Sequence, residues 1–132
     1  MYKSILEPIF PHLVFEINDT YDTVEKACKA RLDLFNFCGD RYAKFLYLDT
    51  DILIRRDLRI IFTLCEKDKL YVLEELSIHN DDSWYGGYTL FGDSRHSYED
   101  PSAFSSGIML FNNSPFIKKL FEDITNDINN SW

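Results

Sequence analysis

The sequence predicts an α/β domain with a mostly parallel sheet, and three observations support this prediction. Short runs with strand character alternate with segments whose apolar residues recur at helical spacing. The run over residues 43–48 is predominantly apolar, as expected for a parallel strand that is covered on both faces. The 132 residues, of which 45% are hydrophobic, suffice for one domain over residues 1–132 with its own core.

In the first half of the chain we expect a strand, a helix and a second strand. Residues 12–17 are predicted to form the short first strand. Apolar residues at helical spacing then predict a helix over residues 21–36, and Gly39 is expected to close it. The strand at 43–48 follows, and residues 52–54 are predicted to extend it beyond a bend.

In the second half we expect a short helix and two further strands. Asp57 is predicted to cap the short helix. The strands are predicted over residues 70–73 and 108–111, on either side of a long polar and aromatic stretch, 74–101. A loop of that length in a compact domain is usually functional or mobile.

The last element is predicted to be an amphipathic helix. Ser114-Pro115 combines an N-cap residue with a proline at the first helical position. The apolar residues that follow are spaced to form one helical face: Ile117, Leu120, Phe121, Ile124 and Ile128.

Composition narrows the choice of partners and of compartment. The net charge of −8 argues against nucleic acid or an acidic membrane surface as the main partner. The dense basic group of Arg55, Arg56 and Arg59 is interpreted as the solvated start of a helix. No stretch approaches the about 20 apolar residues of a membrane span, so no transmembrane segment is predicted. Three scattered cysteines and an N-terminus without a signal peptide predict a reducing, cytoplasmic location.

The most informative segment is the apolar run Phe45–Leu48, which leads directly into Asp49-Thr50-Asp51. In extended backbone, residues i and i+2 point to the same side, so both carboxylates are predicted to face one hard cation. An α/β sheet collects its ligands at the carboxyl ends of its strands, where this pair is expected to lie. A turn or a helix cap is the alternative role for these aspartates.

Three segments in this order resemble the retaining glycosyltransferases of family 8, a group that includes glycogenin and galactinol synthase. They are Ala30-Arg31-Leu32, the run Phe45–Ile54 with its acidic pair, and the stretch Phe104–Asn112, which begins with a small-residue turn. The resemblance spans residues 20 to 125. It implies a Rossmann-like GT-A fold and the retaining transfer of a hexose from a nucleotide sugar, expected to be a UDP-sugar.

The resemblance also implies roles for individual residues. Asp49 and Asp51 would bind Mn²⁺ or Mg²⁺ next to the donor diphosphate, and Thr50 lies between them in the donor site. Arg31 would reach the donor, its alternative role being that of an exposed arginine on a helix. Three small residues would contact the donor sugar: Ser105, Ser106 and Gly107. The first of these stands where the family usually has asparagine.

Two parts of such an enzyme have no counterpart here, so we expect a central fragment that is truncated at both ends. Too few residues precede Arg31 for the first β-α-β unit of the family. The acceptor-side acidic motif and the segment that supplies a third metal ligand do not occur before Trp132. His79 and His96 lie outside such a motif and are interpreted as solvated. The sequence therefore identifies neither a catalytic residue nor the acceptor.

Two other functions are kept open. A non-catalytic remnant would keep the acidic pair and bind a nucleotide sugar or a partner chain. A different nucleotide-dependent transferase on a similar fold is the third interpretation, because fold does not fix function. The aromatic segment Trp84–Tyr88 is a candidate for acceptor binding through its ring faces, or for packing onto the core.

Overall fold

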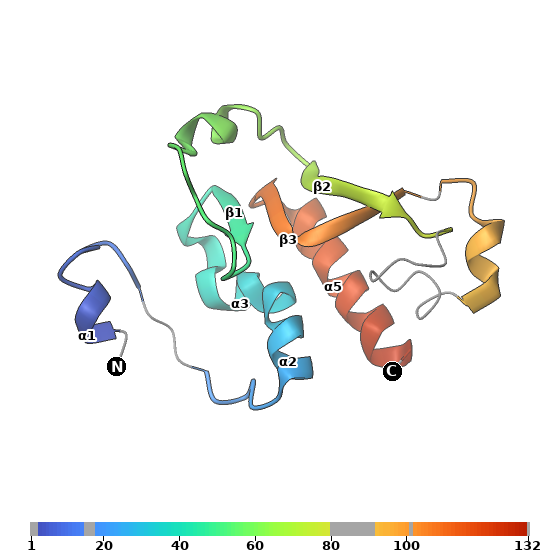
Figure 1. Ribbon diagram of the computed structural model, residues 1–132, viewed down its shortest axis with the longest axis horizontal. Helices are drawn as coiled ribbons and strands as arrows, with labels where there is room; N and C mark the ends of the chain where they lie inside the picture. Colours follow the sequence, from blue (N-terminus) through green and yellow to red (C-terminus); the bar gives the residue numbers. More distant parts are fainter. Residues whose placement is uncertain (1–2, 15–17, 80–91, 101, 132) are drawn as a thin grey trace. The chain divides into compact units, whose positions relative to one another are not determined.

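A computed structural model describes four stretches of the chain, shown as a ribbon in Figure 1: residues 3–14, 18–79, 92–100 and 102–131. Contacts between residues divide the chain into two compact units, Met1–Gly39 and Asp40–Trp132, and each unit is described by itself. The single domain predicted for residues 1–132 stays a prediction.

The first unit is built from short helical segments. They are the helices α1 (Lys3–Leu6), α2 (Val24–Lys29) and α3 (Leu34–Cys38), with the 3-10 helix η1 (Ala30–Asp33) joining the last two. The helix predicted over 21–36 is therefore present, but it is divided into three consecutive pieces.

The ends of this helical stretch follow the sequence signals. The Thr23 side chain accepts a hydrogen bond of 3.2 Å from the Lys26 N–H, which caps the first turn. Gly39 follows the last turn with φ of +54°, a conformation that favours glycine. The strand predicted over 12–17 is wrong for residues 12–14, which form no strand; residues 15–17 lie outside the described part of the chain.

The second unit contains a three-stranded sheet and a long helix. The strands are β1 (Lys44–Leu48), β2 (Leu70–Ser77) and β3 (Ser102–Asn112), in the order β1-β3-β2. Helix α5 spans Pro115–Ser131, and three 3-10 helices lie in the connections: η2 (Gly39–Arg41), η3 (Arg59–Thr63) and η4 (Gly92–Ser97).

The predicted mostly parallel, Rossmann-like GT-A sheet is wrong. Strand β3 lies between β1 and β2 and pairs with both in the antiparallel direction. Neighbouring parallel strands need a long crossover connection, usually a helix. The helical segment found between β1 and β2 is the five-residue η3, and β3 then separates these two strands. The alternation of strands and helices in the sequence does not specify this order.

Three of the predicted strands are correctly located, and two of them are longer than expected. The strand over 43–48 is β1, while those over 70–73 and 108–111 are parts of β2 and β3. The stretch 74–101 is therefore not one continuous loop. The predicted strand extension over 52–54 is wrong, because these residues are irregular.

Aromatic packing near the C-terminal end of β3 forms the core of the second unit. Phe111 has no exposed surface and pairs across the sheet with Phe45, with ring centroids 5.5 Å apart. The Phe121 ring of α5 lies 5.0 Å from the Phe111 ring, which places α5 on this face of the sheet, as Figure 1 shows. Neighbouring strand residues alternate between the two faces, so the other face carries the even-numbered residues of β1.

Helix α5 begins and packs as its sequence predicts. The Ser114 Oγ atom is buried and accepts a hydrogen bond of 3.2 Å from the Ile117 N–H, as an N-cap does. Ile117 and Phe121 are 0% and 2% exposed, whereas Phe116 is 58% exposed. The amphipathic character of this helix is therefore confirmed.

Replacing Phe111 by alanine is expected to lower the free energy of unfolding by about 3–5 kcal/mol, because the truncation leaves a cavity between two other rings. The matched control is Phe116→Ala on the exposed side of α5, which is expected to change it by less than about 0.5 kcal/mol. Urea denaturation followed by circular dichroism measures both values. Equal midpoints for the two variants would contradict this core.

In the first unit, partial burial of the Tyr21 phenol and its hydrogen bond to Asp33 raise the pKa of Tyr21 to about 12 from 10.0. Folding thus favours the neutral phenol. The neutral Tyr21 phenol stabilises the folded state fully below pH 10.0, and this stabilisation is lost as the pH rises through about 12. The difference in absorbance between wild type and Tyr21→Phe reports the ionisation of Tyr21. In an alkaline titration its midpoint is expected near this pKa. Asp33→Asn is expected to move the midpoint toward 10.0, and an unchanged midpoint would refute the assignment.

Candidate functional site

The acidic pair lies in a turn immediately after β1. The Ile52 N–H donates a hydrogen bond of 3.2 Å to the Asp49 carbonyl oxygen, which closes the turn over 49–52. Asp49 is half-buried, while Thr50 and Asp51 are exposed. The extended geometry predicted for the pair is therefore wrong, because the chain bends as soon as its pairing with β3 ends.

The two main sequence motifs meet at this end of the sheet. The Asp49 N–H donates to the Gly107 carbonyl oxygen at 2.8 Å, one residue beyond the last pair of the β1–β3 register, Leu48–Ile108. A Cβ atom at Gly107 would lie 2.8 Å from Asp49 Oδ2, closer than real Cβ contacts allow. The absence of a side chain at Gly107 therefore makes room for the Asp49 carboxylate.

A tyrosine orients the same carboxylate. The Tyr47 hydroxyl donates a hydrogen bond of 2.7 Å to Asp49 Oδ1, a strong type of contact because the acceptor carries charge. Tyr47 is two residues from Phe45 in β1, so it lies on the face that α5 covers. The sequence analysis did not identify Tyr47, although the i, i+2 rule that was applied to Asp49 and Asp51 also relates Tyr47 to Asp49.

The small residues before the apolar part of β3 are in the strand, not in the turn that was predicted. The Ser105 Oγ atom accepts a hydrogen bond of 3.2 Å from the Gly107 N–H, while Ser106 is exposed. The β2–β3 register changes between the pairs Val72–Met109 and Leu73–Ser105, so the ladder is irregular where β3 approaches Asp49.

Arg31 belongs to the first unit and is described apart from the acidic pair. It lies in η1, where its Nε atom donates a hydrogen bond of 3.1 Å to the Cys28 carbonyl oxygen. The expectation that Arg31 reaches a donor molecule stays a prediction.

Two histidines lie close together elsewhere in the second unit. The rings of His79 and His96 have centroids 5.4 Å apart, and the buried Nε2 atom of His79 has no hydrogen-bond partner. The interpretation of His79 as solvated is therefore wrong. Within the described stretches, no group of three or more His, Cys, Asp or Glu side chains could hold a metal ion. The segment Trp84–Tyr88 lies outside these stretches.

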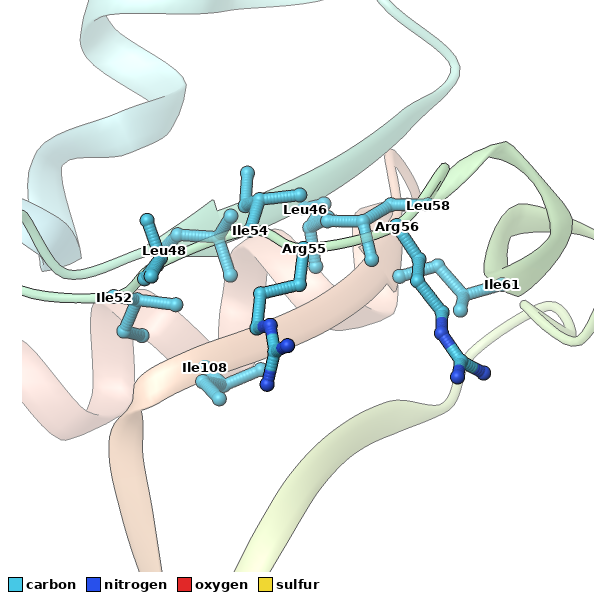
Figure 2. A pocket seen from close by; sticks show the side chains of 10 residues that line it. Leu46, Leu48, Ile52, Ile54, Arg55, Arg56, Leu58, Ile61 and Ile108 are labelled. Atoms are coloured by element: carbon cyan, nitrogen blue, oxygen red, sulfur yellow. The ribbon is translucent and has the colours of Figure 1, made fainter.

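The sheet face opposite α5 carries an apolar groove of about 440 Å³. Leu46 and Leu48 of β1 and Ile108 of β3 line it from the sheet, and the irregular segment 52–56 lines it from the side. Figure 2 shows that Arg55 and Arg56 extend from this segment, so the interpretation of these two as part of a helix start is wrong.

None of the three cysteines forms a disulfide with another described residue; the side chain is exposed at position 28, half-buried at 38 and buried at 65. Burial raises the pKa of the Cys65 thiol, which keeps this side chain neutral. None of them takes part in the arrangement around Asp49 that is described above.

Comparison with family models, curated proteins and solved structures finds no match to this chain. Among the residues with described structure, no helix is both long enough and apolar enough to cross a bilayer.

The contact between Gly107 and Asp49 can be tested by Gly107→Ala. The new methyl group is expected to displace the Asp49 carboxylate, because a short side chain moves more easily than the sheet, and to break the hydrogen bond from Tyr47. The free energy of unfolding is expected to change by less than about 1 kcal/mol. Nuclear magnetic resonance of the Tyr47 ring measures the change, and Ser106→Ala, an exposed neighbouring position, is the control. Tyr47 resonances that stay at their wild-type positions in Gly107→Ala would rule the contact out.

Proposed function

We propose that this chain is part of a retaining hexosyltransferase that uses a UDP-sugar donor together with Mn²⁺ or Mg²⁺. The observation that supports this most is the contact between Asp49 and Gly107. The acidic pair and the small-residue motif are far apart in the sequence, and they were related only through the resemblance to family 8. Their contact is what a shared donor site requires.

The residues around Asp49 fit a hard divalent cation. The absence of a side chain at Gly107 lets the Asp49 carboxylate lie against β3, and the hydrogen bond from Tyr47 orients its Oδ1 atom. Asp49 and Asp51 would hold the ion, which would act as a Lewis acid that neutralises charge on the departing diphosphate. Two carboxylates leave coordination positions for phosphate oxygens and water.

The remaining residues would position the donor. Ser105 and the exposed Ser106, on either side of the strand next to Gly107, would offer hydroxyl groups to the donor sugar. Thr50 lies between the two aspartates in the exposed turn and would contact the donor there. We also propose a cytoplasmic location, which the odd number of scattered cysteines supports.

The second candidate function is a non-catalytic remnant that binds a nucleotide sugar or a partner chain. It is favoured by one observation: the described residues offer no third protein ligand beside the acidic pair. UDP binding is measured before any screen for transfer, because a transferase requires donor binding and so does a remnant that binds a nucleotide sugar.

Calorimetric titration of UDP with and without Mn²⁺ tests the donor site. Wild-type protein is expected to bind UDP only when Mn²⁺ is present. The variant with both Asp49→Asn and Asp51→Asn is expected to lose at least about tenfold in affinity, because amides replace the charged ligands of the metal. Tyr47→Phe is expected to weaken binding by a smaller factor, since it removes only the group that orients Asp49.

A control is Asp127→Asn, which removes one carboxylate charge at an exposed position on α5. It is expected to bind UDP as the wild type does. Absence of Mn²⁺-dependent binding in the wild type would reject the donor site. Binding without any hydrolysis or transfer of a UDP-sugar would favour the non-catalytic candidate.

A further inference from the structure

We propose that the groove opposite α5 binds a single-chain alkyl phosphate, with the hydrocarbon chain on the apolar floor and the phosphate paired with Arg55 and Arg56. This inference concerns the other face of the sheet and does not depend on the proposed sugar transfer.

The floor of the groove suits a hydrocarbon chain. Leu46, Leu48 and Ile108 line it with aliphatic side chains from two paired strands, and Leu58 and Ile61 add to the same surface. The volume of about 440 Å³ lies within the range of sites that bind small molecules. Burying such a surface against an alkyl chain is favourable by about 25 cal/mol per Å² of apolar area.

The rim of the groove carries two arginine side chains that have no acidic partner among the described residues. Arg55 and Arg56 line the groove and are exposed, and neither forms a hydrogen bond or an ion pair with any residue that the structure describes. Figure 2 shows both guanidinium groups on the same side of the segment that carries them. Arg59 differs, because its Nε atom donates to both Asp57 carboxylate oxygens, at 2.8 and 3.0 Å.

The charge of the rim selects the head group. Two unpaired guanidinium groups match a phosphate monoester, which carries a charge of about −1.5 to −2 at neutral pH and accepts bidentate hydrogen bonds from arginine. The whole chain has a net charge of −8, so it repels anions in general, and an anion must be bound by local pairing. The combination of this rim with an aliphatic floor therefore indicates an anionic amphiphile.

The groove is separate from the proposed donor site. The Asp49 carboxylate is held by Tyr47, which lies on the face that α5 covers, whereas Leu46 and Leu48 point to the other face. The sheet thus keeps the carboxylate away from the anion that Arg55 and Arg56 would bind.

Calorimetric titration with monomeric decyl phosphate tests the proposal. Decanol serves as the probe for the hydrocarbon chain alone, and inorganic phosphate serves as the probe for the head group alone. Decyl phosphate is expected to bind at least about tenfold more tightly than either part. The double variant Arg55→Gln, Arg56→Gln is expected to lose at least about tenfold in affinity, since it removes the charge-assisted hydrogen bonds to the phosphate. Leu53→Asp, at a lining position that is 82% exposed, is expected to weaken binding without unfolding the chain.

Arg59→Gln is the matched control, because it removes a nearby guanidinium that is already paired with Asp57. It is expected to bind decyl phosphate within about twofold of wild type. Equal affinity for decanol and decyl phosphate would overturn the role of the arginines, and equal affinity for inorganic phosphate would overturn the role of the groove. Analytical ultracentrifugation provides a further test. If the protein is a dimer that neither binds decyl phosphate nor dissociates in its presence, the groove is assigned to a second copy of the protein. That result would overturn the proposal.

Discussion

The burial of Phe111 between Phe45 and Phe121 is the constraint on which the second unit depends. Phe111 lies in the central strand, and its ring contacts both the neighbouring strand and α5. The pairing of Phe45 with Phe111 sets the register of β1 against β3, and this register ends one residue before Asp49 and Gly107. A slip by one residue would move every side chain of β1 to the other face. The geometry around the carboxylate is therefore a consequence of aromatic packing at the opposite end of the strand.

The two faces of the sheet have different chemical properties. The face that contacts α5 carries the aromatic core and, where β1 ends, the carboxylate held by Tyr47. The other face carries aliphatic side chains that α5 does not cover, and at the rim are Arg55 and Arg56, which pair with no residue in the described stretches. Strand alternation alone produces this separation, because odd and even residues of β1 point to opposite sides. The carboxylate held by Tyr47 and the aliphatic floor of the groove thus lie on opposite faces of one short strand.

Local signals in the sequence located most of the elements. The N-cap at Ser114 and the apolar spacing after it predicted α5, and the apolar run before Asp49 predicted β1. Both signals act within a few residues, as capping and side-chain periodicity do. The helical spacing over 21–36 was also correct, but spacing did not reveal the 3-10 segment η1 that divides the helix, since a change from α to 3-10 bonding leaves the apolar pattern nearly unchanged.

The sequence by itself determined where β1 and α5 form and that an acidic pair follows β1. Only the tertiary structure decided the direction of the strands, the contact of Asp49 with Gly107 and the groove on the opposite face. These features depend on β3, which is distant in the sequence and forms its contacts only by inserting between β1 and β2. Hydrophobic periodicity indicates which side of a strand is buried. It does not indicate which strand is its neighbour, or whether that neighbour runs parallel or antiparallel to it.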